Sequence, residues 1–307
     1  MPPRNVPRVV DLSEFLRRAQ ARSLRVHRLL VKASRSSFAP PEFLHDLHRE
    51  VRRARVDARV LQSTVRSGSR EGLQELESML AELSQRVGEA RDRDVLEADL
   101  RRLSHNVRPP VARMARTLAR ELHKEGRVLR RRLGRDAKRA LTNASVRLPS
   151  GLQGLRGPGA RARFARAVRE ELAEARRELG RAHRRARRHP SVRRLHRLRI
   201  SLRRLRHLRT SLAHHPREAD LEARWRRLQR DLGAHHDLGV LEDWVSERAA
   251  PETRKRLRRL LHEELERRRM RAENGLTLPA SPALHRLPRG TRRRSRSTTA
   301  QRRRQAG

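Results

Sequence analysis

The sequence contains no cysteine and very few aromatic residues. Its 307 residues include two Trp, four Phe and no Tyr, so aromatic side chains make up 2% of the chain. Without cysteine, disulfide bridges and thiolate metal sites are excluded. With so few rings on which unpaired bases could stack, sequence-specific recognition of single-stranded RNA is disfavoured. Binding of duplex or structured nucleic acid through its phosphates alone remains open.

Long apolar segments are also missing. No run of about 18 apolar residues occurs, and the N-terminal segment MPPRNVPRVVDLSEFL lacks the apolar stretch of a signal peptide. The sequence therefore predicts a protein without a membrane span that resides in the cytoplasm.

Acidic residues are scarce relative to basic ones. The chain carries 78 Lys and Arg against 35 Asp and Glu, a formal net charge of +43, and only four of the basic residues are Lys. Such a charge opposes compaction by self-repulsion unless anions bind. Guanidinium groups suit bidentate contacts with phosphate. Residues 275–307 contribute nine Arg and no acid, so most of the charge belongs to the remainder of the chain. These features predict a polyanionic partner.

The apolar residues recur with helical spacing and without strand-like alternation, which predicts an all-α fold. Residues 148–160, LPSGLQGLRGPGA, predict a linker between a first helical bundle at 11–147 and a second at 161–274. Residues 1–10 and 275–307 are expected to be disordered tails. Five helices are expected in each antiparallel bundle: 12–34, 41–66, 70–87, 92–104 and 109–144 in the first, and 161–188, 190–214, 217–232, 237–248 and 251–273 in the second.

One basic helical signature occurs twice, 151 residues apart. Residues 45–55 read HDLHREVRRAR and residues 196–206 read HRLRISLRRLR. Helical periodicity places the basic residues of each copy on one face and leucines, valines or alanines on the other. The alternative is that each basic face is only the ordinary charged, solvent-exposed face of a surface helix. The recurrence of the same residues at the same offsets in both copies disfavours this alternative. The signatures predict an anion-binding stripe made by His45, His48, Arg52, Arg53 and Arg55 in the first half and by His196, Arg199, Arg203, Arg204 and Arg206 in the second.

A further basic stripe lies along one face of the last helix expected in the first half. Like charges at such spacing repel each other, so solvent or a bound anion must screen them. Its counterpart in the second half is interrupted by Glu266. The residues predicted to contribute to anion binding here are Arg113, Arg116, Arg120, Lys124 and Arg127, with Lys255, Arg259 and His262 as the counterparts.

A second repeated element follows each signature. It reads LSQRVGEARDRDVLE around Gly88 and Asp92, and LQRDLGAHHDLGVLED around Gly233 and Asp237. In both copies the glycine is expected to end one helix and the aspartate to open the next as its N-cap. A metal site at Asp92 and Asp94 is disfavoured because Gly239 occupies the position of Asp94 in the second copy.

The two signatures, together with the Gly-x-x-Arg-Asp-x-Asp-Val element, resemble the CHAD family, named for conserved histidines in an α-helical domain. The resemblance spans roughly residues 12–273. It implies two pseudo-symmetric antiparallel four-helix bundles that form a basic central groove, binding of inorganic polyphosphate there, and association with polyphosphate granules. His48 stands where the family usually has Arg, and His235-His236 replaces the Arg of the second copy. Protonation of histidines below about pH 6.5 predicts tighter binding in mild acid.

Catalysis is not supported by the sequence. No Gly-rich nucleotide loop or phosphate loop occurs, and the second signature has Arg197 where Asp46 stands in the first. The sequence therefore predicts no catalytic residues, no metal and no cofactor. The main rival to polyphosphate binding is a nucleoid- or ribosome-associated protein that holds nucleic-acid phosphates through its basic surface and tail. A scaffold for acidic proteins is a third possibility. The sequence does not fix the oligomeric state.

Overall fold

The computed structural model describes residues 8–35, 40–65, 70–105, 107–143, 152, 155, 158–214, 219–249 and 251–276. These residues are almost entirely helical, which confirms the all-α class. Two two-residue strands are the exception. In chain order the elements are β1 (Arg8–Val9), α1 (Leu12–Arg35), α2 (Pro41–Gln62), α3 (Arg70–His105), α4 (Pro109–Asn143), α5 (Pro158–Arg188), α6 (Val192–Leu212), β2 (Ala213–His214), α7 (Ala219–Arg248) and α8 (Pro251–Leu276).

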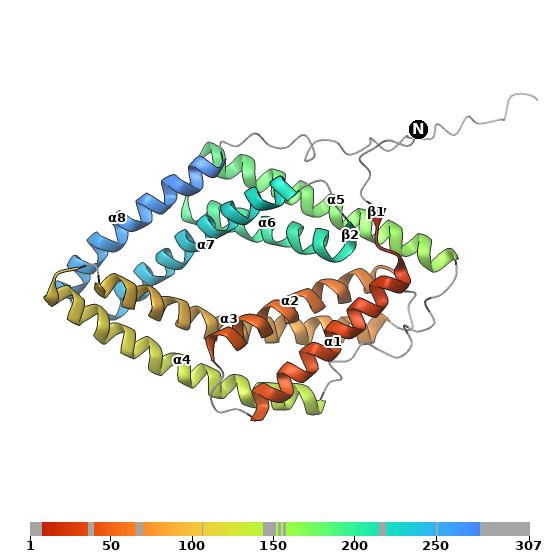
Figure 1. Ribbon diagram of the computed structural model, residues 1–307, viewed down its shortest axis with the longest axis horizontal. Coiled ribbons are helices and arrows are strands. Elements are labelled where there is room, and N and C mark those ends of the chain that lie inside the picture. The colour runs from red at the N-terminus through yellow and green to blue at the C-terminus, as the bar shows by residue number, and fades with distance from the viewer. Residues whose placement is uncertain are drawn as a thin grey trace, which may run out of the picture.

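The helices form two four-helix groups with matching order, α1–α4 and α5–α8 (Figure 1). In the first group α3 packs on α2 and α4, and α1 packs on α2 and α4. In the second, α6 lies between α5 and α7, and α8 packs on α7 and α5. Across the middle of the molecule, α2 and α3 face α6 and α7 (Figure 1). The helices that carry the repeated elements are therefore the inward-facing ones.

Amphipathic spacing explains how each helix buries one side. Leu47, Val51, Ala54, Ala58 and Leu61 of α2 are all buried, as their helical periodicity predicts. In α6 the residues Leu198, Leu202, Leu205 and Leu212 are buried in the same way. The basic residues of both signatures consequently lie on the sides of α2 and α6 that face away from these cores.

Two of the three apolar clusters join the halves. One packs the start of α1 against α5, with the rings of Phe15 and Phe164 5.0 Å apart. Another packs Leu96 and Leu100 of α3 against Leu241 and Trp244 of α7. Burial of such surface contributes roughly 25 cal/mol per Å² of apolar area. The relative placement of the halves thus rests on apolar packing at both ends of the molecule.

The sequence prediction that Gly88 and Gly233 end helices was wrong. Both lie inside continuous helices, Gly88 in α3 and Gly233 in α7, and Asp92 and Asp237 are therefore not N-caps. Glycine inside a helix costs only about 1 kcal/mol. Packing of α3 on both sides of Gly88, through Leu80 and Leu83 before it and Leu96 after it, outweighs that cost.

The ends of the described chain are more ordered than the sequence predicted. β1 pairs antiparallel with β2, Arg8 opposite His214 and Val9 opposite Ala213, and so ties the N-terminal segment to the second half. At the other end α8 continues to Leu276, whose side chain is buried. The expected disorder of residues 1–10 and 275–307 was therefore wrong for residues 8–10 and 275–276. Residues 1–7 and 277–307 lie outside the described residues.

Across the described ranges, none of the helices combines the length and apolarity needed to cross a membrane. Within those same ranges, His, Asp and Glu side chains do not gather in a group of three or more that could hold a metal ion.

Candidate anion-binding site

The inward-facing helices of both halves bring their basic side chains into one electrostatic cluster. Burial lowers the pKa of Arg52 of α2, and so do the nearby charges of Arg203 and Arg199 of α6 and of Arg91 of α3. This group, termed the central cluster below, consists of His45, His48, Arg52, Arg91, Asp92, His196, Arg199, Arg203, His207, His236 and Asp237.

Arg52 is the most constrained cation of the cluster. Its Nε and Nη1 atoms are buried and have no hydrogen-bond partner among the described residues. Desolvation, followed by the charges of Arg203 and Arg91, lowers the pKa of Arg52 to about 9. Desolvation and the neighbouring Arg199 lower the pKa of Arg203 to about 10. Buried donors without acceptors are costly. The cluster is therefore short of acceptor oxygens and of negative charge, which a bound anion would supply.

Acidic residues neutralise the positive charge of the central cluster only in part. Asp237 of α7 approaches Arg199, with 3.9 Å between its Oδ1 and the Nη2 of Arg199. Desolvation raises the pKa of Asp237 and that of Asp92, and each carboxylate lies near Arg199. The two aspartates also interact with each other across the two halves. Two carboxylates therefore face Arg52, Arg91, Arg199 and Arg203, and a net positive charge remains.

The repeated glycines face the signature helices, and a Cβ at either position would make an ordinary van der Waals contact there. A Cβ on Gly88 would lie 3.5 Å from Cε1 of His48, and a Cβ on Gly233 would lie 3.8 Å from Nε of Arg199. His48 and Arg199 occupy the same position of the two signatures. The two halves thus repeat one contact, in which a glycine of the third helix of each half faces the fourth residue of the signature.

The histidines of the cluster are held neutral. Desolvation, followed by the charge of Arg52, lowers the pKa of His48 to about 2. Desolvation and Arg199 lower the pKa of His236 to about 4. The Nδ1 atoms of His236 and His196 lie 3.1 Å apart, and the ring centroids 4.2 Å apart. In the free protein, burial and then the neighbouring arginines oppose a gain of charge by His48 and His236 below pH 6.5. Tighter binding of an anion in mild acid stays a prediction.

Stability should fall when the pH is lowered from 7.5 to 6.0. The pKa values of His48, His207 and His236 lie well below 6.5 in the folded state, so the unfolded chain binds more protons as the pH falls. Each histidine then costs roughly 1 kcal/mol at pH 6, by linkage from an unfolded pKa near 6.5. Thermal unfolding in a buffer without phosphate should show a decrease in Tm of several degrees.

The comparison stops at pH 6 because burial raises the pKa of Asp57 to about 6, which acts in the opposite sense below that pH. Adding back a polyanion at pH 6 should recover part of the loss. An unchanged Tm between the two pH values would contradict the claim that these histidines stay neutral in the folded protein.

Besides Arg199, which pairs with Asp237, four of the predicted arginines are engaged by acids of the protein. Arg53 pairs with Glu50, at 3.4 Å, and Arg204 pairs with Glu171 and Glu178, at 3.0 and 2.7 Å. The two halves repeat the same kind of ion pair at the last signature position. Arg55 pairs with Glu77 of α3 at 2.6 Å, and Arg206 pairs with Glu222 of α7 at 2.5 Å. Arg53 thus pairs within α2, and Arg55, Arg204 and Arg206 join helices within one half. The central cluster instead joins the halves.

The other predicted stripes lie on the outer surface. Arg113, Arg116 and Arg120 of α4 are exposed and line a hollow of about 700 Å³ with residues of α3, among them Arg101 and Ser104. No member of the central cluster lines this hollow. The remaining predicted residues are also exposed, namely Lys124 and Arg127 of α4 and Lys255, Arg259 and His262 of α8.

The sequence did not identify Arg91 and His207 as contributors to the site. Arg91 belongs to the second repeated element, whose adjacent aspartates were interpreted as helix caps; His236 of the other copy was noted only as a replacement for Arg. His207 follows His196 by eleven residues, which is three helical turns on the same face of α6. Its Nε2 is buried without a partner among the described residues, and desolvation and Arg52 lower its pKa to about 3. Helical spacing could have identified both residues.

Comparisons with solved structures found the following similarities. A crystal structure of the CHAD domain from the plant Ricinus communis superimposes with a TM-score of 0.62 at 20% sequence identity, covering 90% of this chain and 96% of that one. PptA from Streptomyces chartreusis superimposes with a TM-score of 0.44 at 19% identity, covering 85% of this chain and 95% of that one. No match was found among curated proteins.

The sequence pattern that defines the CHAD domain matches residues 16–246, which include both signatures and both glycine elements. The match covers most of the described helices and all four helices that carry the central cluster. The chain belongs to the CHAD domain family.

Proposed function

We propose that the protein binds inorganic polyphosphate, without catalysing a reaction on it, by holding the chain against the central cluster. The observation that carries this proposal is the buried guanidinium group of Arg52, which lacks acceptors and lies near Arg91, Arg199 and Arg203. A phosphate chain provides negatively charged acceptor oxygens at every unit. Charge-assisted hydrogen bonds between guanidinium and phosphate are among the strongest available to a protein.

The burial of the cluster favours a slender ligand. Arg52 and Arg203 are only partly accessible, and the donor atoms of Arg52 noted above are buried. A flexible inorganic chain carries its charge along a thin backbone, whereas a nucleic-acid duplex presents its phosphates on a wide cylinder. The central cluster therefore suits polyphosphate better than a duplex.

The aromatic side chains also disfavour single-stranded nucleic acid. Phe15, Phe43, Phe164, Trp225 and Trp244 are all buried, and they are the aromatic residues among the described positions. Arginines cover both tryptophans, Arg209 at 4.9 Å from Trp225 and Arg248 at 5.1 Å from Trp244. Bases would find no exposed ring in the described residues on which to stack. The family membership adds to this argument, and association with polyphosphate granules in the cytoplasm is part of the proposal.

Competition tests the proposal against the nucleic-acid alternative. Long-chain polyphosphate is expected to displace fluorescent duplex DNA or RNA at equal phosphate concentration and equal ionic strength. Both ligands will bind more weakly as salt rises, so the displacement must be measured at one salt concentration. Short phosphate chains should compete less well than long ones. If duplex DNA or RNA remains bound in excess long-chain polyphosphate, the proposed function is wrong.

A further inference from the structure

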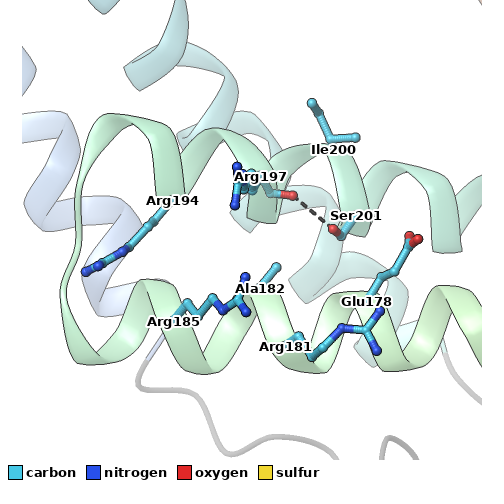
Figure 2. Close-up of a pocket in the computed structure, with 8 residues that line it drawn as sticks. All are labelled: Glu178, Arg181, Ala182, Arg185, Arg194, Arg197, Ile200 and Ser201. Carbon is cyan, nitrogen blue, oxygen red and sulfur yellow. Dashed lines mark hydrogen bonds between the residues drawn. The ribbon is translucent and has the colours of Figure 1, made fainter.

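A second basic pocket lies between α5 and α6, on a different side of α6 from the central cluster. Its volume is about 430 Å³. Figure 2 shows four arginines from the two helices around it, with Arg194 toward one end and Glu178 toward the other. The lining consists of Glu178, Arg181, Ala182 and Arg185 of α5 and Arg194, Arg197, Ile200 and Ser201 of α6. None of these residues belongs to the central cluster.

The positive charge of this pocket is incompletely neutralised. Its one acid, Glu178, pairs with Arg204, which does not line the pocket. Arg181 pairs with Glu174, and Arg194 donates from Nη1 to the backbone oxygen of His189 at 2.8 Å. The guanidinium groups of Arg185 and Arg197 form no ion pair within the described residues. Two cations are thus available to an external anion.

The first half shows what the same face looks like when it is neutralised from within. By the spacing of the signatures, Asp46 and Glu50 of α2 correspond to Arg197 and Ser201 of α6. In the first half Asp46 pairs with Arg49 at 2.9 Å, and Glu50 pairs with Arg49 and Arg53 at 3.3 and 3.4 Å. The second half therefore has a cation and a hydroxyl where the first has two carboxylates.

This difference argues against a purely structural role for the pocket arginines. The repeat folds in the first half with acids at the corresponding positions, so the fold does not require Arg197. Like charges gathered in an open pocket repel each other unless an anion screens them. The geometry points to a second site for a phosphate chain in the α5–α6 pocket. This inference rests on the proposed function, because it assigns another site to the same ligand.

The chemistry of the lining specifies an inorganic chain. Guanidinium groups from two helices can contact successive phosphate units, and the pocket is larger than a single phosphate group needs. No aromatic side chain lines it, so a nucleotide base would find no ring on which to stack. A long chain that engages both this pocket and the central cluster would gain affinity through multivalency.

Calorimetric titration with tripolyphosphate at low ionic strength tests the inference. The variant Arg185→Gln/Arg197→Gln is expected to bind one tripolyphosphate fewer than the wild-type protein. Arg187→Gln/Arg188→Gln is the matched control, because it removes two exposed charges from the end of α5 that do not line the pocket. The control should retain the wild-type stoichiometry. Arg52→Gln/Arg203→Gln should lose the central site while the pocket still binds.

The three variants separate the possible failures. If Arg185→Gln/Arg197→Gln keeps the wild-type stoichiometry, or if the control loses as much, the second site does not exist and the proposed function is unaffected. If Arg52→Gln/Arg203→Gln binds long and short chains as the wild-type protein does, the central site is wrong, while loss of one ligand in the pocket variant still supports the second site.

Discussion

Replacing Arg52 and Arg203 together with glutamine should weaken binding of long-chain polyphosphate by roughly 100-fold or more. Each hydrogen bond between a charged donor and an acceptor contributes about 1.5–3 kcal/mol. Arg52 lies on α2 and Arg203 on α6, so the variant removes one partly buried cation from each half. Titration of the variant and wild-type proteins at one ionic strength measures the change in Kd.

Two controls show whether position or total charge causes the loss. Arg25→Gln/Arg28→Gln removes the same charge from exposed positions on α1 and should change Kd by less than about threefold, as expected for solvent-screened charges. Deletion of residues 277–307 removes nine arginines. That deletion should also weaken binding less than the central variant does. Losses that follow the number of charges removed would instead indicate nonspecific adhesion.

In the absence of polyanions, Arg52→Met should make the protein more stable. Methionine fills a similar space without a charge, and it relieves both the buried donors and the repulsion from Arg91, Arg199 and Arg203. Replacing buried charged groups with apolar ones of similar volume is often stabilising by about 1–4 kcal/mol. We expect a rise in Tm of about 3–6 °C, measured by calorimetry without phosphate. Polyphosphate should then stabilise the wild-type protein far more than the variant.

Arg55→Met is the matched control for this experiment. It lies one turn further along α2, but its guanidinium group pairs with Glu77, so its loss should leave Tm unchanged or lower it. A lower Tm for Arg52→Met would show that the charge of Arg52 is compensated in the folded protein, contrary to the unpartnered atoms described above.

The sequence predicted the organisation of the inward-facing helices well. The two signatures identified α2 and α6, and the leucines and alanines predicted to be buried behind them are buried. These features depend on helical periodicity, which is a local property. The continuity of α3 and α7 could not be predicted in the same way. The cost of a mid-helix glycine is local, but the packing that offsets it comes from Leu96 against Trp244, more than 140 residues away in the chain.

The sequence also could not predict which arginines pair with an acidic residue. Nothing local distinguishes Arg52, whose donor atoms are buried without partners, from Arg55, which pairs with Glu77 of the next helix. The lowered pKa of His48 is equally hard to predict, because it depends on burial and then on Arg52, on Arg91 of α3 and on Arg203 of α6. A helical stripe therefore indicates which side chains share a face but not which of them lack an acid.

A crystal structure of the protein with a bound phosphate chain tests the central claim most directly. We predict density for one chain in contact with Arg52 of the first half and with Arg199 or Arg203 of the second. Density confined to the exposed arginines of α4, with none at Arg52 and Arg203, would contradict the account.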